Sequence, residues 1–197
     1  MKMMTSAFIA VFILSTVAGT VAAPSEKQGI ALMNEGMGLR NKAENSSDLE
    51  RAQKKFREAL SIFERTGWDE GRTSALLLIG NVYKDLGQYT EALEYYRNAF
   101  ELSRNIGYAK AQGTSLNNVG LIYENLGQYS KALDYHEKAL QIYKKIGDTN
   151  NEGTSLNNIG RIYDNLGQYK KALDYYQKSL DVRRKTGDID GEQTTLN

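Results

Sequence analysis

GTSLNNVGLIYENLGQYSKALDYHEKALQIYKKIGDTNNE, residues 113–152, is followed directly by GTSLNNIGRIYDNLGQYKKALDYYQKSLDVRRKTGDIDGE, residues 153–192. The two segments are identical at 25 of 40 positions. A third copy covers residues 73–112, and a degenerate first copy covers about residues 26–66, with a long polar turn, NKAENSSD. Repeats of this length indicate a stacked array, because one unit alone cannot bury its apolar face.

Each unit is predicted to contain two helices. In residues 113–152 the apolar side chains recur at intervals of three and four, which is the spacing of one helix face. The first helix has this pattern up to Leu126, a turn follows at Gly127–Gln128, and the second helix is expected to stop near Gly147–Asp148. The residues of the two packing faces are Leu116, Val119, Gly120 and Tyr123, then Ala132, His136, Ala139, Leu140 and Tyr143.

The pattern Leu-x2-Val/Ile-Gly-x2-Tyr, then Gly-x-Tyr-x2-Ala, then Ala or Ser seven residues on, resembles the tetratricopeptide repeat over about residues 26–192. The resemblance implies an all-α, right-handed superhelical α-solenoid of antiparallel helix pairs, with about four repeats. The usual unit of the family is about 34 residues and often has a tryptophan, where this chain has Leu76, Leu116 and Leu156. The period of 40 looks like the repeats of kinesin light chains, Pins-type regulators and bacterial arrays joined to CHAT domains.

The N-terminal residues are predicted to be an export signal. Lys2 is followed by an apolar run of 13 residues, Ala7 to Gly19, and by small residues before Pro24, which is the arrangement of a Sec signal peptide. We expect cleavage after residue 22, with residues 23–197 as the repeat domain in the periplasm or outside the cell. The alternative is an uncleaved anchor, for which the run is short.

The composition excludes several kinds of functional site. The chain has no cysteine and a net charge of +1, so disulfides, thiolate zinc sites and cysteine nucleophiles are excluded, and no electrostatic reason favours nucleic acid or an anionic membrane as partner. The single histidine, His136, occupies the position of Tyr96 and Tyr176 in the neighbouring units and is expected to be a packed ring rather than a base. We therefore expect no enzyme activity, no cofactor and no metal site, with carboxylate-only calcium binding left open.

The polar side chains of the first helices are the candidate binding residues. In the fold that the resemblance implies, first helices line the concave surface, and an asparagine amide both donates and accepts hydrogen bonds, which suits binding to an extended peptide backbone. Leu121 and Arg161 would add selectivity. The alternative is that Asn118 and Asn158 only connect neighbouring helices. The candidates are Asn81, Lys84, Asn117, Asn118, Leu121, Glu124, Asn157, Asn158, Arg161 and Asp164.

These features predict a non-catalytic scaffold that binds a protein or peptide. A carboxylate clamp is disfavoured because Thr114, Asn117, Thr154 and Asn157 occupy the positions where it needs Lys or Arg. Residues 193–197 resemble the start of a further repeat. Either the sequence continues in a longer array, which we prefer, or it associates end to end with another chain. Two other functions therefore stay open, a sensing region of a larger exported enzyme or signalling protein, and a self-assembling module.

Overall fold

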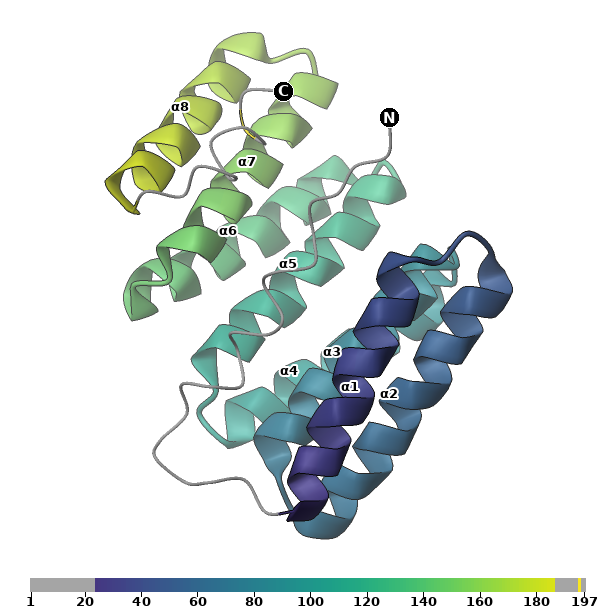
Figure 1. Ribbon diagram of the computed structural model, residues 1–197. Helices are drawn as coiled ribbons and strands as arrows, with labels where there is room; N and C mark the ends of the chain where they lie inside the picture. The colour runs from purple at the N-terminus through teal and green to yellow at the C-terminus, as the bar shows by residue number, and fades with distance from the viewer. Residues whose placement is uncertain (1–23, 187–194, 196–197) are drawn as a thin grey trace. The chain divides into compact units, whose positions relative to one another are not determined.

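The computed structural model describes residues 24–186 and residue 195, and the regular secondary structure within them is helical. The predicted signal sequence, residues 1–22, and most of the predicted start of a further repeat lie outside the described residues. The described chain forms eight helices (Figure 1), and the sequence divides into two compact units at the boundary between Ile106 and Gly107. The predicted all-α class, with antiparallel helix pairs and about four repeats, is confirmed.

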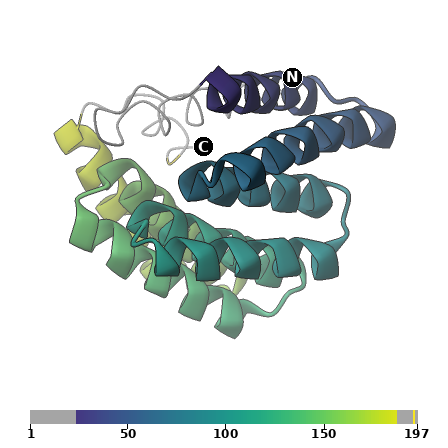
Figure 2. The ribbon, with the colours of Figure 1, turned by 90° about the horizontal axis from the view of Figure 1, so that it is seen from below.

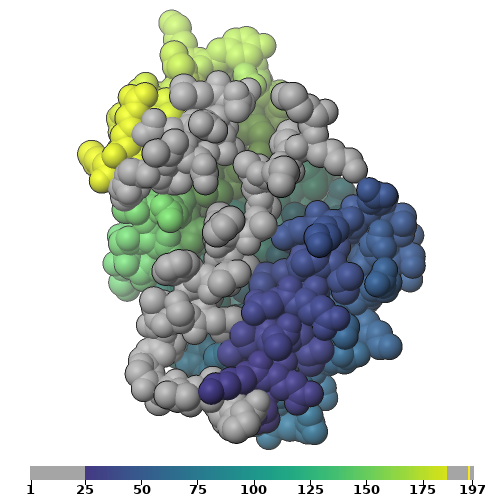
Figure 3. All heavy atoms as spheres, viewed as in Figure 1, coloured from purple at the N-terminus to yellow at the C-terminus, as the bar shows by residue number. Residues whose placement is uncertain are grey.

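The first unit contains two helix pairs. In the first pair, α1 (Pro24–Asn41) packs on α2 (Ser46–Thr66), and in the second, α3 (Asp69–Asp85) packs on α4 (Tyr89–Asn105). Helix α2 also packs on α3, so the pairs stack in chain order. The atoms of α1 and α2 form a continuous surface in the space-filling view (Figure 3).

The second unit repeats this arrangement. Helix α5 (Ala109–Asn125) packs on α6 (Tyr129–Ile146), and α7 (Thr149–Asn165) packs on α8 (Tyr169–Thr186), while α6 packs on α7. The helices of each pair lie side by side and run in opposite directions, as a second view also shows (Figure 2). The helix pairs begin at Asp69, Ala109 and Thr149, four residues before the predicted repeat starts, because the identity of the GTSLNN segments, and not the helix caps, had defined the period.

A glycine with a left-handed backbone follows each helix from α2 to α7. These glycines recur every 20 residues with φ between 68° and 73°, at Gly67, Gly87, Gly107, Gly127, Gly147 and Gly167. Only glycine adopts this conformation without a steric penalty. The predicted turn at Gly127 and the predicted helix end at Gly147 are therefore confirmed, and each 40-residue repeat consists of two 20-residue halves.

Glycines also determine how closely the two helices of a pair approach. A β-carbon built on Gly80 would lie 2.6 Å from Cε1 of Tyr96, and one on Gly120 would lie 2.8 Å from Cε1 of His136. The same contact joins Gly160 to Tyr176, and Gly36 to Phe56 in the first repeat. Each first helix thus carries a glycine against which a ring of the second helix packs.

The first repeat has the same packing in a shifted register. Its ring, Phe56, lies 40 residues before Tyr96, whereas its glycine, Gly36, lies 44 residues before Gly80. The four additional residues lie around the α1–α2 turn, where Asn45 caps α2 by accepting a hydrogen bond from the Asp48 backbone N–H at 3.1 Å. Helix α2 is accordingly longer than α4, with 21 residues against 17. The predicted long polar turn is present and preserves the ring-on-glycine contact.

Candidate functional site

In the first unit, the candidate residues lie on the last turns of α3 and bond to other parts of that unit. Asn81 Oδ1 accepts a hydrogen bond of 2.7 Å from the hydroxyl of Tyr96 on α4. Burial, with a smaller effect of the nearby Asp85 carboxylate, raises the pKa of Tyr96 above its usual value, so the phenol stays neutral and donates. Lys84 Nζ lies 3.6 Å from Asp85, which also pairs with Arg40 of α1 at 2.6 Å.

In the second unit, side chains from two helices converge on one side-chain oxygen atom of a third helix. Oδ1 of Asn117 on α5 lies 2.9 Å from Nδ1 of His136 on α6, and it accepts a hydrogen bond of 3.1 Å from Nδ2 of Asn158 on α7. His136 is fully buried and Asn158 is 5% exposed, whereas Asn117 is half-buried. The carbonyl side of the Asn117 amide is therefore used within the protein.

Burial makes His136 a neutral ring. Desolvation, with a smaller contribution from the positive charge of Arg161, lowers the pKa of His136 to about 3. Its other nitrogen, Nε2, is buried and has no hydrogen-bond partner. The ring packs against Gly120, as the sequence predicted for a core ring, and it additionally forms the contact with Asn117, which the sequence did not reveal.

The asparagines at the next position along each helix are interior residues. We had predicted that Asn118 and Asn158 belong to an open binding surface. Asn118 is only 9% exposed and Asn158 only 5%, so neither forms part of such a surface. Asn158 instead bonds to Asn117 of the preceding repeat. The alternative interpretation, in which these two asparagines connect neighbouring helices, therefore describes Asn158 directly. The reason is the helical period: a residue 100° further around the helix faces the neighbouring repeat.

The charged candidates also bond to each other. Nε and Nη2 of Arg161 on α7 donate to the two carboxylate oxygens of Glu124 on α5, at 2.6 and 2.8 Å. The hydrogen bond to Glu124 raises the pKa of Arg161 above its usual value, so the guanidinium stays charged. The Glu124 side chain is only 9% exposed. Arg161 is thus paired within the protein while its side chain stays 44% exposed, and its role in selectivity stays a prediction.

The remaining candidates of the second unit are accessible. Leu121 is half-buried and Asp164 is exposed. Asn157 is half-buried, and its amide has no hydrogen-bond partner among residues 24–186. Asn157 occupies the same position in α7 as Asn117 in α5, yet only Asn117 is held by a ring of the second helix. These three side chains, the Nδ2 of Asn117 and the Arg161 side chain, which is 44% exposed, are the part of the predicted site in this unit that a ligand can reach.

The tyrosines that were expected in the core form half-buried stacked pairs. Tyr123 lies 5.4 Å from Tyr135, centroid to centroid, and Lys131 and Lys138 lie over the two rings. The same pairs occur between α3 and α4 and between α7 and α8, as Tyr83–Tyr95 and Tyr163–Tyr175. Each ring stacks on its partner, and a lysine or arginine also lies over each of these rings except Tyr83, so the pairs are packing elements between the two helices of a repeat.

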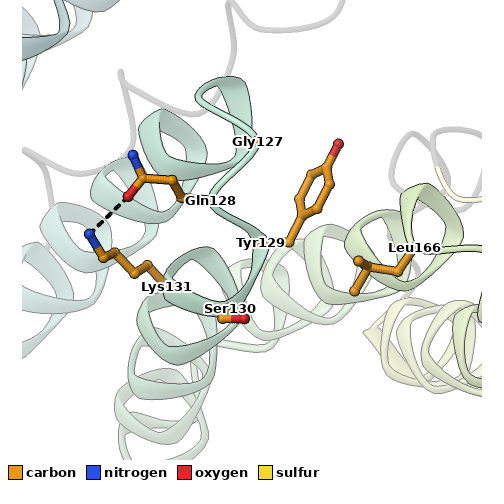
Figure 4. Close-up of a pocket in the computed structure, with 6 residues that line it drawn as sticks. All are labelled: Gly127, Gln128, Tyr129, Ser130, Lys131 and Leu166. Carbon is orange, nitrogen blue, oxygen red and sulfur yellow. Dashed lines mark hydrogen bonds between the residues drawn. The ribbon is translucent and has the colours of Figure 1, made fainter.

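A shallow hollow lies at the α5–α6 turn (Figure 4). Its walls are formed by residues 127–131 and by Leu166 at the end of α7, and Lys131 Nζ donates to Gln128 Oε1 at 2.8 Å. The hollow is open to solvent and is lined by turn residues, so it does not enclose a small molecule. Within residues 24–186, no three His, Asp or Glu side chains form a metal-binding group, and no helix is long and apolar enough to cross a membrane.

The profile of the tetratricopeptide repeat family matches residues 71–145 and 111–185, more than half of the chain. The chain belongs to the tetratricopeptide repeat family. A comparison with curated protein sequences gave no match. The family assignment agrees with the helix pairs and with the ring-on-glycine contacts described above.

Several solved structures share the fold. Aspartyl phosphate phosphatase F from Bacillus subtilis has a TM-score of 0.78 and 18% identity, over 89% of this chain and 45% of that one. The Rap conjugation gene regulator of plasmid pLS20, in complex with the Phr* peptide, has a TM-score of 0.74 and 19% identity, over 93% and 53%. BtubC (BKLC) from P. vanneervenii has a TM-score of 0.62 and 20% identity, over 83% and 75%. The chain thus spans about half the length of the two Rap-type structures.

Proposed function

We propose that this tetratricopeptide repeat chain is a non-catalytic interaction scaffold that binds an extended peptide or a partner protein along its first helices. The observation that carries the proposal is the half-buried amide of Asn157, which has no hydrogen-bond partner within residues 24–186. The Asn157 amide is not among the buried atoms that lack a partner, so water reaches it in the free protein, and a peptide backbone can replace that water at both ends of the amide. The Phr* peptide complex of a Rap-type structure supports a peptide as ligand.

The binding residues in the second unit lie on α5 and α7. Asn117 offers its amide nitrogen, Asn157 its whole amide, and Leu121 an apolar contact. The charge of Arg161 is balanced by Glu124, which leaves Asp164 as the exposed charge among the candidate residues of this unit. We therefore infer that recognition relies on hydrogen bonds to the backbone and on apolar contacts more than on charged side chains.

The test uses a peptide selected from a random-sequence display library on the full chain. Asn157→Ala should weaken binding of that peptide by about 2- to 12-fold, which is the value of one hydrogen bond of 0.5–1.5 kcal/mol, and should leave the melting temperature unchanged. Lys138→Ala and Lys178→Ala, on exposed positions of the second helices, are the controls and should not change the affinity. Affinity that depends on these lysines and not on Asn157 would assign binding to the opposite surface.

Export is a second part of the proposal. Residues 1–22 have the arrangement of a Sec signal peptide, and the intact mass of the protein expressed with these residues should show their loss. A full-length, membrane-bound species would contradict cleavage. The 40-residue repeats resemble those of kinesin light chains, Pins-type regulators and CHAT-associated arrays, and this resemblance is also part of the proposal.

In the alternative to an independent scaffold, the repeats are part of a larger protein. In that case the array would be the sensing region of an exported enzyme or signalling protein. The half-length coverage of the Rap-type structures is the observation that keeps this alternative open. The gene sequence beyond the codon for Asn197 distinguishes the two, since an attached catalytic domain would support the sensing region. Self-assembly is tested separately, by light scattering at two protein concentrations.

A further inference from the structure

The only histidine of the chain differs from its counterparts in the polar atom that it reaches. Tyr96 in the second repeat donates to Asn81, one turn further along α3 than Leu77. His136 in the third repeat instead contacts Asn117, which corresponds to Leu77, while Leu121 takes the place of Asn81. Between the second and the third repeat, the polar and the apolar residue of the first helix thus change places, and the ring of the second helix changes from tyrosine to histidine.

The hydrogen bonds fix the orientation of the Asn117 amide. A neutral imidazole has one N–H, and with Oδ1 of Asn117 as acceptor this hydrogen lies on Nδ1. Nε2 then keeps a lone pair without a partner, which is less costly than a buried N–H without one. Asn158 donates to the same oxygen from the other repeat. Two donors therefore hold Oδ1, and the amide cannot rotate without losing both bonds.

The opposite end of the amide is available. Nδ2 of Asn117 has no hydrogen-bond partner among residues 24–186, and it is not among the buried atoms that lack one. Asn117 therefore presents hydrogen-bond donors only. Asn157, by contrast, is not held by Tyr176 and can present either end of its amide.

From this geometry we propose that His136 is a positioning residue that turns Asn117 into a dedicated donor, so that the third repeat selects a hydrogen-bond acceptor, such as a backbone carbonyl, on the bound chain. The proposal rests on the proposed peptide-binding function and specifies the polarity of one of its contacts. It gives the buried histidine a role in recognition that packing against Gly120 does not require.

The first experiment needs no ligand. Since His136 is the only histidine, nitrogen-15 NMR of the imidazole reports its protonation state without ambiguity. The hydrogen should lie on Nδ1 at neutral pH, and Asn117→Ala should shift it toward Nε2. A hydrogen on Nε2 in the unmodified chain would mean that Asn117 faces the other way, and would overturn the proposal.

The second experiment separates positioning from packing. His136→Tyr places a phenol beside Leu121, where the chain has no acceptor, so stability and affinity for the library-selected peptide should both fall. Adding Leu121→Asn recreates the Tyr96–Asn81 pair of the second repeat. Leu121→Asn alone is the reference for affinity, because it also removes the apolar contact of Leu121. The double variant should recover its melting temperature but bind about 2- to 12-fold more weakly than Leu121→Asn alone, because Asn117 is still not oriented.

The outcomes are distinct. If the double variant recovers its stability and binds the peptide as tightly as Leu121→Asn alone, His136 only packs and the inference is overturned. If Asn157→Ala weakens the peptide and Asn117→Ala does not, the proposed function stands and the inference fails. If neither change affects the peptide, the binding surface itself is wrong.

Discussion

Arg161 and Glu124 form a two-point ion pair that joins α7 to α5, with N–O distances of 2.6 and 2.8 Å. The two residues are 37 positions apart in the chain, and the Glu124 carboxylate is nearly buried beneath the guanidinium. A comparable pair, Arg40 with Asp85, joins α1 to α3 in the first unit. Within each unit, an ion pair therefore connects the first helices of its two repeats.

Arg161→Leu tests the strength of this connection. The change introduces the residue of the preceding repeat, Leu121, but leaves the Glu124 carboxylate buried without a partner. We expect the free energy of unfolding to fall by about 1–3 kcal/mol, measured by urea denaturation. Glu124→Leu in the same chain should recover much of this loss, because no charge is then left unpaired.

Lys178→Ala is the control for that measurement. Its pair with Asp174 is exposed on α8 and screened by solvent, so the change should leave the free energy of unfolding unchanged within the error of the measurement. An effect as large as that of Arg161→Leu would contradict the distinction between the buried and the exposed ion pair.

Gly80→Ala tests the ring-on-glycine contact. The added methyl group would lie 2.6 Å from Cε1 of Tyr96, so the ring or the helix must move, and the cost should be about 1–3 kcal/mol in unfolding experiments. Gly38→Ala in α1 is the matched change in open space, because a β-carbon there meets nothing within 4 Å. It should instead stabilise the protein by about 0.5–1 kcal/mol, through the higher helix propensity of alanine.

Stability should depend on pH through His136. Burial holds its pKa near 3 in the folded chain, against an ordinary value near 6.5 in the unfolded chain. Below pH 6.5 the unfolded chain takes up a proton that the folded chain does not, so the free energy of unfolding falls, by up to about 1.4 kcal/mol per pH unit, down to pH 3. Above pH 6.5 the histidine contributes no slope.

The free energies of unfolding of the unmodified chain and of a variant without the histidine are best compared by urea denaturation between pH 7 and 5.5, where most carboxylates stay ionised. His136→Phe removes the titrating group and should flatten the curve in this window. An equal slope in both chains would show that other groups cause the pH dependence.

The second and third repeats differ in the sizes of the side chains at two facing positions. Gly113 on α5 faces the ring of Tyr143 on α6, and the corresponding residues of the second repeat are Thr73 and Ser103, both fully buried. Ser103→Tyr alone should destabilise by about 1–3 kcal/mol, because Thr73 occupies the space that the ring needs. Adding Thr73→Gly should recover at least about 1 kcal/mol in a double-mutant cycle. Additive losses would show that the two positions are not in contact.

Much of the fold could be predicted from local pattern. The 40-residue period, the 3.6-residue spacing of apolar positions and the glycines at 127 and 147 predicted the helix pairs and their ends, because each depends on residues close in sequence. The buried ring of His136 followed from its alignment with Tyr96. Only the exact helix starts and the four-residue shift in the first repeat were not anticipated, since caps and turn lengths vary independently of the repeat.

The polar site was decided by the tertiary structure. The sequence placed Asn117, Asn158, Glu124 and Arg161 on first helices, but not the bonds that join Asn158 to Asn117 and Arg161 to Glu124. Those bonds connect residues about 40 positions apart, and they depend on how neighbouring helices pack and which way each side chain turns. A repeat pattern fixes the position of a side chain on its helix, whereas its hydrogen-bond partner is fixed only when the next helix is in place.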